Sequence, residues 1–158
     1  MTRAILFAIL GAALCLTHCA PARAGGAERA LLALCPTRLD LAPQIEAQAR
    51  RHMLHPVLVV SLMHVESRCK AEAVSRRGAI GLLQVMPYGP AANGLTRAQL
   101  RDPATNIKAG CRWLSMLALW CNGLPAGIGA YNSGSCHKSK GFARHVLARF
   151  AATFARAR

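Results

Sequence analysis

The sequence predicts an all-α protein that folds as a single domain. Apolar residues recur at intervals of three and four along several stretches, which is the period of one helix face. Sustained alternation of apolar and polar residues, the pattern of a half-buried strand, is absent from the chain. A length of 158 residues, with no internal repeat and no low-complexity block, suits one domain.

Helix-start signals place the first elements. Asp40 is expected to cap a helix that continues to about Met53. The pair His55-Pro56 is expected to start the next helix, because proline is favoured at the first helical position. Residues 78–86 contain two glycines and are expected to form a turn that leads into a short helix.

The second half of the chain predicts three further helices. Asp102, followed by proline, is expected to cap a strong helix that ends at Trp120. A short apolar helix is expected over residues 125–132, and a closing amphipathic helix over residues 142–150. Its inward residues are expected to be Phe142, Val146, Leu147 and Phe150. Trp113 and Trp120 follow the apolar stripe of their helix and are expected in the core.

The first 24 residues have the features of a secretory signal peptide. Arg3 is followed by an almost unbroken apolar stretch over residues 4–16, and Ala22-Arg23-Ala24 suits signal peptidase. The stretch is too short to remain as a stable membrane span. The protein is therefore expected to be exported to the periplasm or cell envelope, with cleavage after Ala24. A lipoprotein anchored at Cys19 is the minor alternative.

Cysteine content agrees with export. Seven cysteines are present, and Cys15 and Cys19 lie within the expected signal peptide. Five remain, which predicts two disulfides and one unpaired thiol in an oxidising compartment. The remaining cysteines are Cys35, Cys69, Cys111, Cys121 and Cys136. Sequence alone leaves their pairing open, although Cys121 with Cys136 is favoured because the two flank a short segment.

The formal net charge is +14, which indicates attraction to an anionic partner. Export argues against nucleic acid, so an anionic polymer of the cell envelope is the expected partner. The alternative is a solvated basic surface that aids solubility, and both interpretations stay open.

Glu66 is the candidate catalytic residue. It is one of only six acidic residues and shares a helix face with Val59 and Leu62. A carboxyl group held against apolar surface keeps its proton at higher pH, as a general acid requires. None of the other five acids is well placed as a partner, so Glu66 is expected to act alone. Such chemistry works when the substrate supplies the nucleophile.

Four motifs in order resemble the catalytic domain of soluble lytic transglycosylases, a branch of the lysozyme-like superfamily. The motifs are Glu66-Ser67, residues 73–87 with Ser75 and Gly78-Ala79-Ile80-Gly81-Leu82-Leu83-Gln84-Val85-Met86-Pro87, residues 102–114 with Asn106 and Gly110, and Ala130-Tyr131-Asn132-Ser133-Gly134. The resemblance implies a lysozyme-like, disulfide-stapled fold. Residues 55–155 would be the catalytic domain, preceded by a helical segment over residues 25–54.

The resemblance also implies roles for individual residues. Glu66 would protonate the glycosidic oxygen between N-acetylmuramic acid and N-acetylglucosamine, then act as base on the muramyl C6 hydroxyl. The substrate-contacting residues would be Ser75, Gln84, Met86, Tyr131 and Asn132. Structural roles are expected for Ser67, Gly78, Gly81 and Asn106. We expect no metal and no cofactor, because His64-Val65-Glu66 lacks the Pro-Cys-x-x-Cys of zinc deaminases.

The expected function is therefore cleavage of peptidoglycan glycan strands without water, leaving 1,6-anhydro-muramyl ends. Two alternatives stay open: a muramidase that uses water, and a non-catalytic peptidoglycan-binding assembly protein. The enzyme would serve either general wall turnover or the assembly of an envelope-spanning secretion or conjugation complex.

Overall fold

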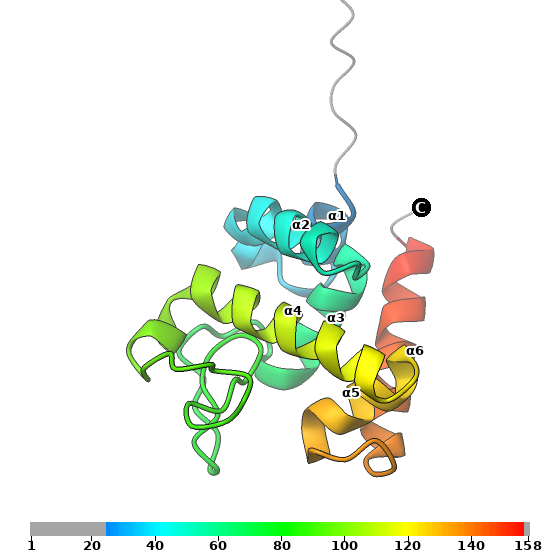
Figure 1. Cartoon of the computed structure of the whole chain (residues 1–158). Helices are drawn as coiled ribbons and strands as arrows, with labels where there is room; N and C mark the ends of the chain where they lie inside the picture. Colours follow the sequence, from blue (N-terminus) through cyan, green and yellow to red (C-terminus); the bar gives the residue numbers. More distant parts are fainter. Residues whose placement is uncertain (1–24, 157–158) are drawn as a thin grey trace, which may run out of the picture.

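A computed structural model of the chain describes residues 25–156 and confirms the predicted all-α class (Figure 1). The expected signal peptide lies outside the described residues. The α-helices are α1 (Gly26–Leu34), α2 (Ala42–Arg51), α3 (Pro56–Ser67), α4 (Pro103–Trp120), α5 (Leu124–Ser133) and α6 (Lys140–Arg156). Two 3₁₀ helices, η1 (Pro36–Leu41) and η2 (Gln99–Arg101), complete the regular structure of residues 25–156.

Helix α3 is the central element of the core. Its residues from Val57 to Met63 are all buried, and α1, α2 and α6 pack against it. Helix α4 packs against α2 and α5 and crosses in front of α3 in Figure 1. A helix that is apolar on all sides is stable only when neighbours surround it, which is the arrangement seen here. The last turn of α3 leaves this core and carries Glu66.

The predicted starts of α3 and α4 are confirmed by helix caps, whereas the predicted cap at Asp40 is absent from the start of α2. Asp102 accepts a 2.7 Å hydrogen bond from the amide of Thr105, as predicted for a cap. His55 caps α3 through its Nδ1, which accepts from the Val57 amide at 3.2 Å. The prediction for Asp40 was wrong, because its carboxylate pairs with the Arg38 guanidinium and α2 begins only after η1.

The segment between α3 and η2 is a chain of turns. The short helix predicted after the glycine-rich turn is absent there; isolated β-bridges join Val74 to Ile80 and Ile80 to Val85 instead. Positive φ angles at Gly78, Gly81 and Gln84 explain the error, because a right-handed helix cannot continue through the left-handed region. This segment, residues 73–87, is named the catalytic loop after the catalytic domain that its motif resembles.

Asn106 fastens the catalytic loop to α4. Its buried side-chain amide donates to the carbonyls of Ile80 and Leu100 at 2.8 Å, and its oxygen accepts from the Leu83 amide at 2.8 Å. Gly81, at φ +79°, lies directly against this amide, so a Cβ there would contact Asn106 Nδ2. Asn106 and Gly81 therefore shape the loop from behind.

Two disulfides link segments of the fold within residues 25–156. Cys121 pairs with Cys136, as favoured from the sequence, and closes a loop that contains α5. Cys35 pairs with Cys69 and ties the end of α1 to the residues that follow α3. Cys111 is the unpaired thiol among residues 25–156; it is buried in α4, and burial raises its pKa to about 12.

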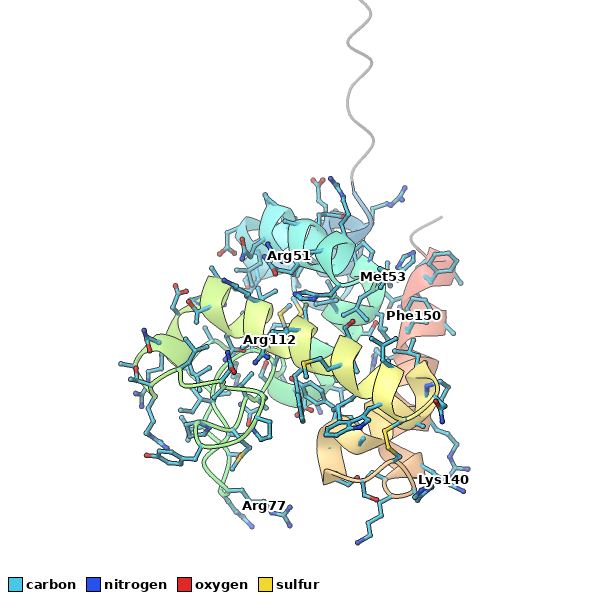
Figure 2. The ribbon with its side chains drawn as sticks, viewed as in Figure 1. Arg51, Met53, Arg77, Arg112, Lys140 and Phe150 are labelled. Carbon is cyan, nitrogen blue, oxygen red and sulfur yellow. A yellow bond between two sulfur atoms is a disulfide. The ribbon has the colours of Figure 1, made fainter. Side chains whose placement is uncertain are left out.

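Of the two tryptophans predicted to lie in the core, Trp113 packs against it and Trp120 does not. Trp120 is 74% exposed, so its predicted burial was wrong; α4 ends there and nothing covers the last turn of its stripe. Trp113 packs against the core, as do the predicted inward residues of α6, including Phe150, labelled in Figure 2. None of the helices in residues 25–156 is long and apolar enough to cross a membrane.

Candidate active site

Glu66 stands at the point where α3 ends. Arg68 and Cys69 both have positive φ angles, which stops the helix directly after Ser67. The Ser67 hydroxyl is buried and bonds to the carbonyls of Leu82 at 2.7 Å and Met63 at 3.0 Å. Ser67 therefore joins the end of α3 to the catalytic loop, and this holds the adjacent Glu66 beside that loop.

The Glu66 carboxyl is half-buried and without a charge partner. Burial raises its pKa from 4.5 to about 7, and burial is the only cause of the shift. No residue in the range 25–156 forms a hydrogen bond or an ion pair with the carboxyl group. A large fraction of Glu66 is therefore protonated near neutral pH, as general acid catalysis requires.

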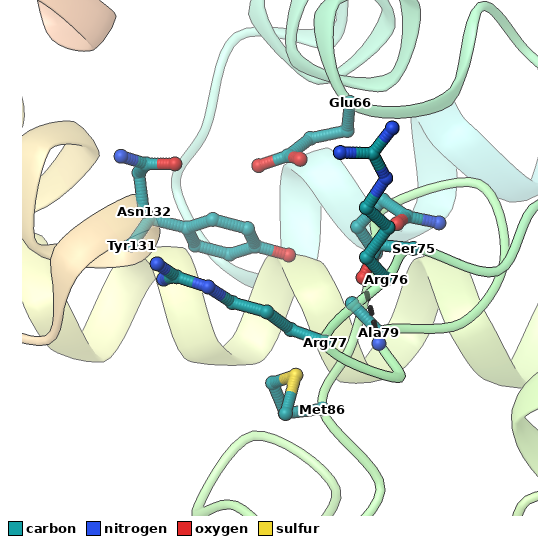
Figure 3. A pocket seen from close by; sticks show the side chains of 9 residues that line it. Glu66, Ser75, Arg76, Arg77, Ala79, Met86, Tyr131 and Asn132 are labelled. Carbon is teal, nitrogen blue, oxygen red and sulfur yellow. Dashed lines mark hydrogen bonds between the residues drawn. The ribbon is translucent and has the colours of Figure 1, made fainter.

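An open pocket of about 630 Å³ surrounds Glu66 (Figure 3). The catalytic loop forms one wall and the end of α5 forms the other. The lining residues are Glu66, Ser75, Arg76, Arg77, Ala79, Gln84, Met86, Tyr131 and Asn132. Glu66 is the only carboxylate among them, so this pocket has one group that titrates as an acid near neutral pH.

The catalytic-loop wall is held by its own side chains. Ser75 Oγ accepts a 3.0 Å hydrogen bond from the Ala79 amide, drawn as a dashed line in Figure 3. Gln84, at φ +47°, donates its amide hydrogens to the carbonyls of Ala73 at 3.2 Å and Gly81 at 2.9 Å. Gln84 therefore orders the wall. Met86 is 42% exposed and presents apolar surface to the pocket.

The opposite wall comes from the C-terminal end of α5. Tyr131 donates its phenol hydrogen to the carbonyl of Leu83 at 2.7 Å, which connects the two walls. Burial, the charge of Glu66 and the charge of Cys111 raise the pKa of Tyr131 well above its usual value. Asn132 is exposed and bonds through Nδ2 to Ser139 Oγ at 2.9 Å. Its side-chain oxygen is free of described partners and faces the pocket region in Figure 3.

The structure brings together all six residues that the sequence predicted for catalysis or substrate contact. The four residues predicted to be structural lie behind the pocket or at its turns rather than in its lining. Sequence reasoning missed Arg76, Arg77 and Ala79, which also line the pocket. Their place in the sequence could have indicated them, because these three residues lie inside the motif that contains Ser75, Gly78 and Gly81. The roles of the lining residues stay predictions.

The arrangement suits acid–base chemistry by a single carboxyl group. The Glu66 carboxyl lines the pocket and lacks a competing hydrogen-bond partner among residues 25–156. After donating that proton, the same carboxylate is a base whose pKa lies near neutral pH. Among residues 25–156, no three His, Cys, Asp or Glu side chains gather into a metal-binding group.

Comparison with known proteins identifies the family. The Transglycosylase SLT domain matches residues 43–147, a range that starts in α2 and ends in α6. This range covers more than half of the chain, and it contains Glu66 and every pocket residue. The chain belongs to this family.

Two similar proteins are both described as membrane-bound lytic murein transglycosylase C. The protein from Actinobacillus pleuropneumoniae serotype 5b (strain L20) is 34% identical over 110 residues, covering 59% of this chain and 30% of that protein. The protein from Haemophilus influenzae (strain ATCC 51907 / DSM 11121 / KW20 / Rd) is 34% identical over 111 residues, covering 59% and 31%. This chain thus spans less than a third of the length of these relatives.

Two solved structures share the fold. The lytic transglycosylase Slt from Pseudomonas aeruginosa, an inactive mutant with glutamine in place of a glutamate, matches with a TM-score of 0.54. It is 27% identical, covering 65% of this chain and 17% of that chain. The 70 kDa soluble lytic transglycosylase from Escherichia coli matches with a TM-score of 0.54 at 23% identity, covering 74% and 21%. The second likeness shows the fold alone.

Proposed function

We propose that this member of the Transglycosylase SLT domain family cleaves the glycan strands of peptidoglycan as a lytic transglycosylase. The observation that carries the proposal is the environment of Glu66. Its carboxyl group is partly buried, its pKa is raised to about 7, and no second carboxylate lines the pocket. The relatives described as lytic murein transglycosylases support the same activity.

The proposed reaction uses Glu66 twice. The protonated carboxyl first donates its proton to the oxygen that joins C1 of N-acetylmuramic acid to N-acetylglucosamine, and the C1–O bond breaks. The carboxylate then takes the proton of the muramyl C6 hydroxyl while O6 bonds to C1. Glu66 ends protonated, no water is consumed, and the product has a 1,6-anhydro-muramyl end. The absence of a second carboxylate from the pocket favours this route, because the substrate itself supplies the nucleophile.

In this proposal the glycan strand is held by Ser75, Gln84, Met86 and Asn132, and Tyr131 holds the two walls of the pocket together. Met86 would support the apolar face of a sugar. The free side-chain oxygens of Gln84 and Asn132 would accept hydrogen bonds from sugar hydroxyl or amide groups. Tyr131 acts indirectly, because its phenol proton is already given to Leu83.

The decisive experiment compares Glu66→Gln with Glu72→Gln. Both changes remove one carboxylate from nearby positions, but Glu72 is exposed and lies outside the pocket lining. Purified peptidoglycan sacculi would be digested and the soluble products analysed by mass spectrometry. We expect wild type and Glu72→Gln to release muropeptides. Glu66→Gln should release none while staying folded, with a urea midpoint no lower than that of the wild type. Cleavage by Glu66→Gln at the wild-type rate would overturn the proposal.

The same products distinguish the two alternatives. An anhydro-muramyl end supports the transglycosylase, whereas a reducing muramyl end supports a muramidase that uses water. Binding to sacculi with no soluble product from the oxidised wild-type protein would indicate a non-catalytic binding protein instead.

The proposal also includes where in the cell the protein acts. The protein would act in the cell envelope, either in general wall turnover or in opening the wall for a secretion or conjugation complex. A deletion strain distinguishes these roles. Loss of secretion or conjugation with unchanged bulk muropeptides would indicate the dedicated role, and changed bulk muropeptides would indicate turnover.

A further inference from the structure

Two consecutive arginines stand at the mouth of the pocket. Arg76 and Arg77 are the central residues of a tight turn in which the Gly78 amide donates to the Ser75 carbonyl at 2.9 Å. The Ser75 hydroxyl accepts from the Ala79 amide across the same turn. Both arginines line the pocket and both are exposed. In Figure 3, Arg76 extends toward the side of Glu66 and Arg77 toward the side of Tyr131 and Asn132.

Neither guanidinium is neutralised within the described chain. The salt bridge found among residues 25–156 joins Arg38 to Asp40 and is far from this turn in sequence. Arg76 and Arg77 form no ion pair or hydrogen bond with any of those residues. A third cation adds to the local charge, because a Cβ on Gly78 would lie 3.7 Å from Arg97 Nη1. Unpaired like charges at one turn favour the binding of an anion.

Glu66 is not the missing partner of these arginines. A cation close to a carboxylate lowers the pKa of that carboxyl group. The pKa of Glu66 is instead raised to about 7, with burial as its only cause. Arg76 and Arg77 therefore line the same pocket as Glu66 without forming an ion pair with it.

We propose that Arg76 and Arg77 form a carboxylate-binding site at the mouth of the pocket, which makes the enzyme select glycan strands that carry free carboxylates. The planar guanidinium matches a carboxylate with two parallel hydrogen bonds, whereas a neutral sugar offers no such acceptor. Peptidoglycan carries carboxylates in two places. Strands stripped of peptide expose the lactyl carboxylate of each muramic acid, and peptide-bearing strands expose carboxylates on the peptide. This inference rests on the proposed function.

Binding measurements in the Glu66→Gln background test the site without cleavage. The probes are a neutral N-acetylglucosamine tetrasaccharide, a peptide-free tetrasaccharide of alternating N-acetylglucosamine and N-acetylmuramic acid, and the same alternating tetrasaccharide with peptides attached. The double change Arg76→Ala with Arg77→Ala is compared with Arg50→Ala with Arg51→Ala. That control pair is also consecutive and exposed, but it lies on α2, where Figure 2 labels Arg51.

We expect the Arg76/Arg77 double variant to lose about fivefold or more in affinity for a carboxylate-bearing tetrasaccharide. Its affinity for the neutral tetrasaccharide should stay unchanged, and the control pair should change neither. Loss confined to the peptide-free probe assigns the site to the lactyl carboxylate, and loss confined to the peptide-bearing probe assigns it to the peptide. Raising the salt to about 0.5 M should shrink the difference, because the groups are exposed. Lysine at both positions should restore only part of the affinity, because an ammonium lacks the planar fork.

Three outcomes overturn the inference. Equal losses for charged and neutral probes would indicate a structural role, and no loss would indicate that the arginines are merely solvated. Failure of the Glu66→Gln protein to bind any probe would also overturn it. Independently, the pH dependence of sacculus cleavage should be the same in the double variant and the wild type. A shifted profile would show that the arginines tune Glu66 instead.

Failure of this inference is distinguishable from failure of the proposed function. If the wild type cleaves sacculi but the Arg76/Arg77 double variant shows no selective loss, only the carboxylate site is wrong. If the wild type cleaves nothing under oxidising conditions, the proposed function itself is wrong.

Discussion

The phenol of Tyr131 donates a 2.7 Å hydrogen bond to the backbone carbonyl of Leu83, across 48 residues of sequence. This bond joins the α5 wall of the pocket to the catalytic-loop wall, beside Glu66. Gly110 on α4 leaves the space for it, because a Cβ there would lie 2.7 Å from Leu83 Cβ and 3.0 Å from the Tyr131 hydroxyl. The pocket therefore keeps its shape through the Tyr131 side chain on α5 and through the space that Gly110 leaves on α4.

Replacing Tyr131 with phenylalanine should weaken both stability and cleavage. The substitution removes the donor and leaves the Leu83 carbonyl without its partner, which costs about 1–3 kcal/mol. We expect the free energy of unfolding in urea to fall by this amount, and the rate of sacculus cleavage to fall by about tenfold as the two walls separate. Tyr88→Phe is the matched control, because Tyr88 is 88% exposed. Equal effects of the two substitutions would contradict the importance of the Tyr131 bond.

Stability should depend on pH through Glu66. Its folded pKa of about 7 lies above the ordinary 4.5, so the folded state holds its proton more tightly than the unfolded state. The contribution of Glu66 protonation to the free energy of unfolding is fully present below about pH 4.5. It declines as the pH rises from 4.5 to about 7, and above that pH stability no longer changes through Glu66. Wild type should lose about 3 kcal/mol relative to Glu66→Gln across this window.

The free energy of unfolding of both proteins is measured in urea between about pH 4 and pH 8, with about one unfolding curve per pH unit. Subtracting the Glu66→Gln curve removes the contributions of the other titrating groups. A difference between the two proteins that is independent of pH would show that the Glu66 carboxyl is well hydrated in solution.

Gly81 and Gly94 form a matched pair for testing the catalytic loop. Both have positive φ angles, +79° and +83°, but a Cβ on Gly81 would contact Asn106 whereas one on Gly94 would meet nothing within 4 Å. Gly94→Ala should therefore cost only the backbone strain, about 1–2 kcal/mol. Gly81→Ala should cost at least about 3 kcal/mol, because it also breaks the buried Asn106 network. Urea unfolding measures both values, and similar losses would show that Asn106 moves aside without cost.

Removing a disulfide should destabilise the fold, and slightly more for the longer loop. The Cys121–Cys136 bond has a sequence separation of 15 and the Cys35–Cys69 bond one of 34. The loop-closure entropy predicts losses of about 3 and about 4 kcal/mol when each pair is replaced by alanine. Reductant should lower the stability of the wild type and leave a variant without either bond unchanged. A variant that still responds to reductant would indicate a different pairing.

Much of the fold was predictable from local signals. The apolar pattern of α3, α4 and α5 and the proline after His55 and Asp102 specify helices within one or two turns of sequence. The errors lie where local signals compete. Asp40 has the side chain of a cap but bonds to Arg38, and the residues after Gly78 remain in turns because Asn106 binds their backbone.

The site was predictable as a set of residues, and its geometry was not. The order of the motifs identifies Glu66, Gln84 and Tyr131 as candidate site residues. No spacing in the sequence shows that Tyr131 donates a hydrogen bond to Leu83. Likewise, charge alone does not distinguish Arg77, which lines the pocket, from Arg51, which lies on α2. Both facts depend on how α5 and the catalytic loop pack against α4.

The sequence by itself determined the helical class, the candidate acid and the motifs around it, because helix periodicity and capping act over a few neighbouring residues. Only the tertiary structure decided the partners of Cys35 and Cys69, the exposure of Trp120 and how far burial raises the pKa of Glu66. Burial and contact depend on segments that are far apart in the chain, and a local pattern carries no information on which of those segments meet.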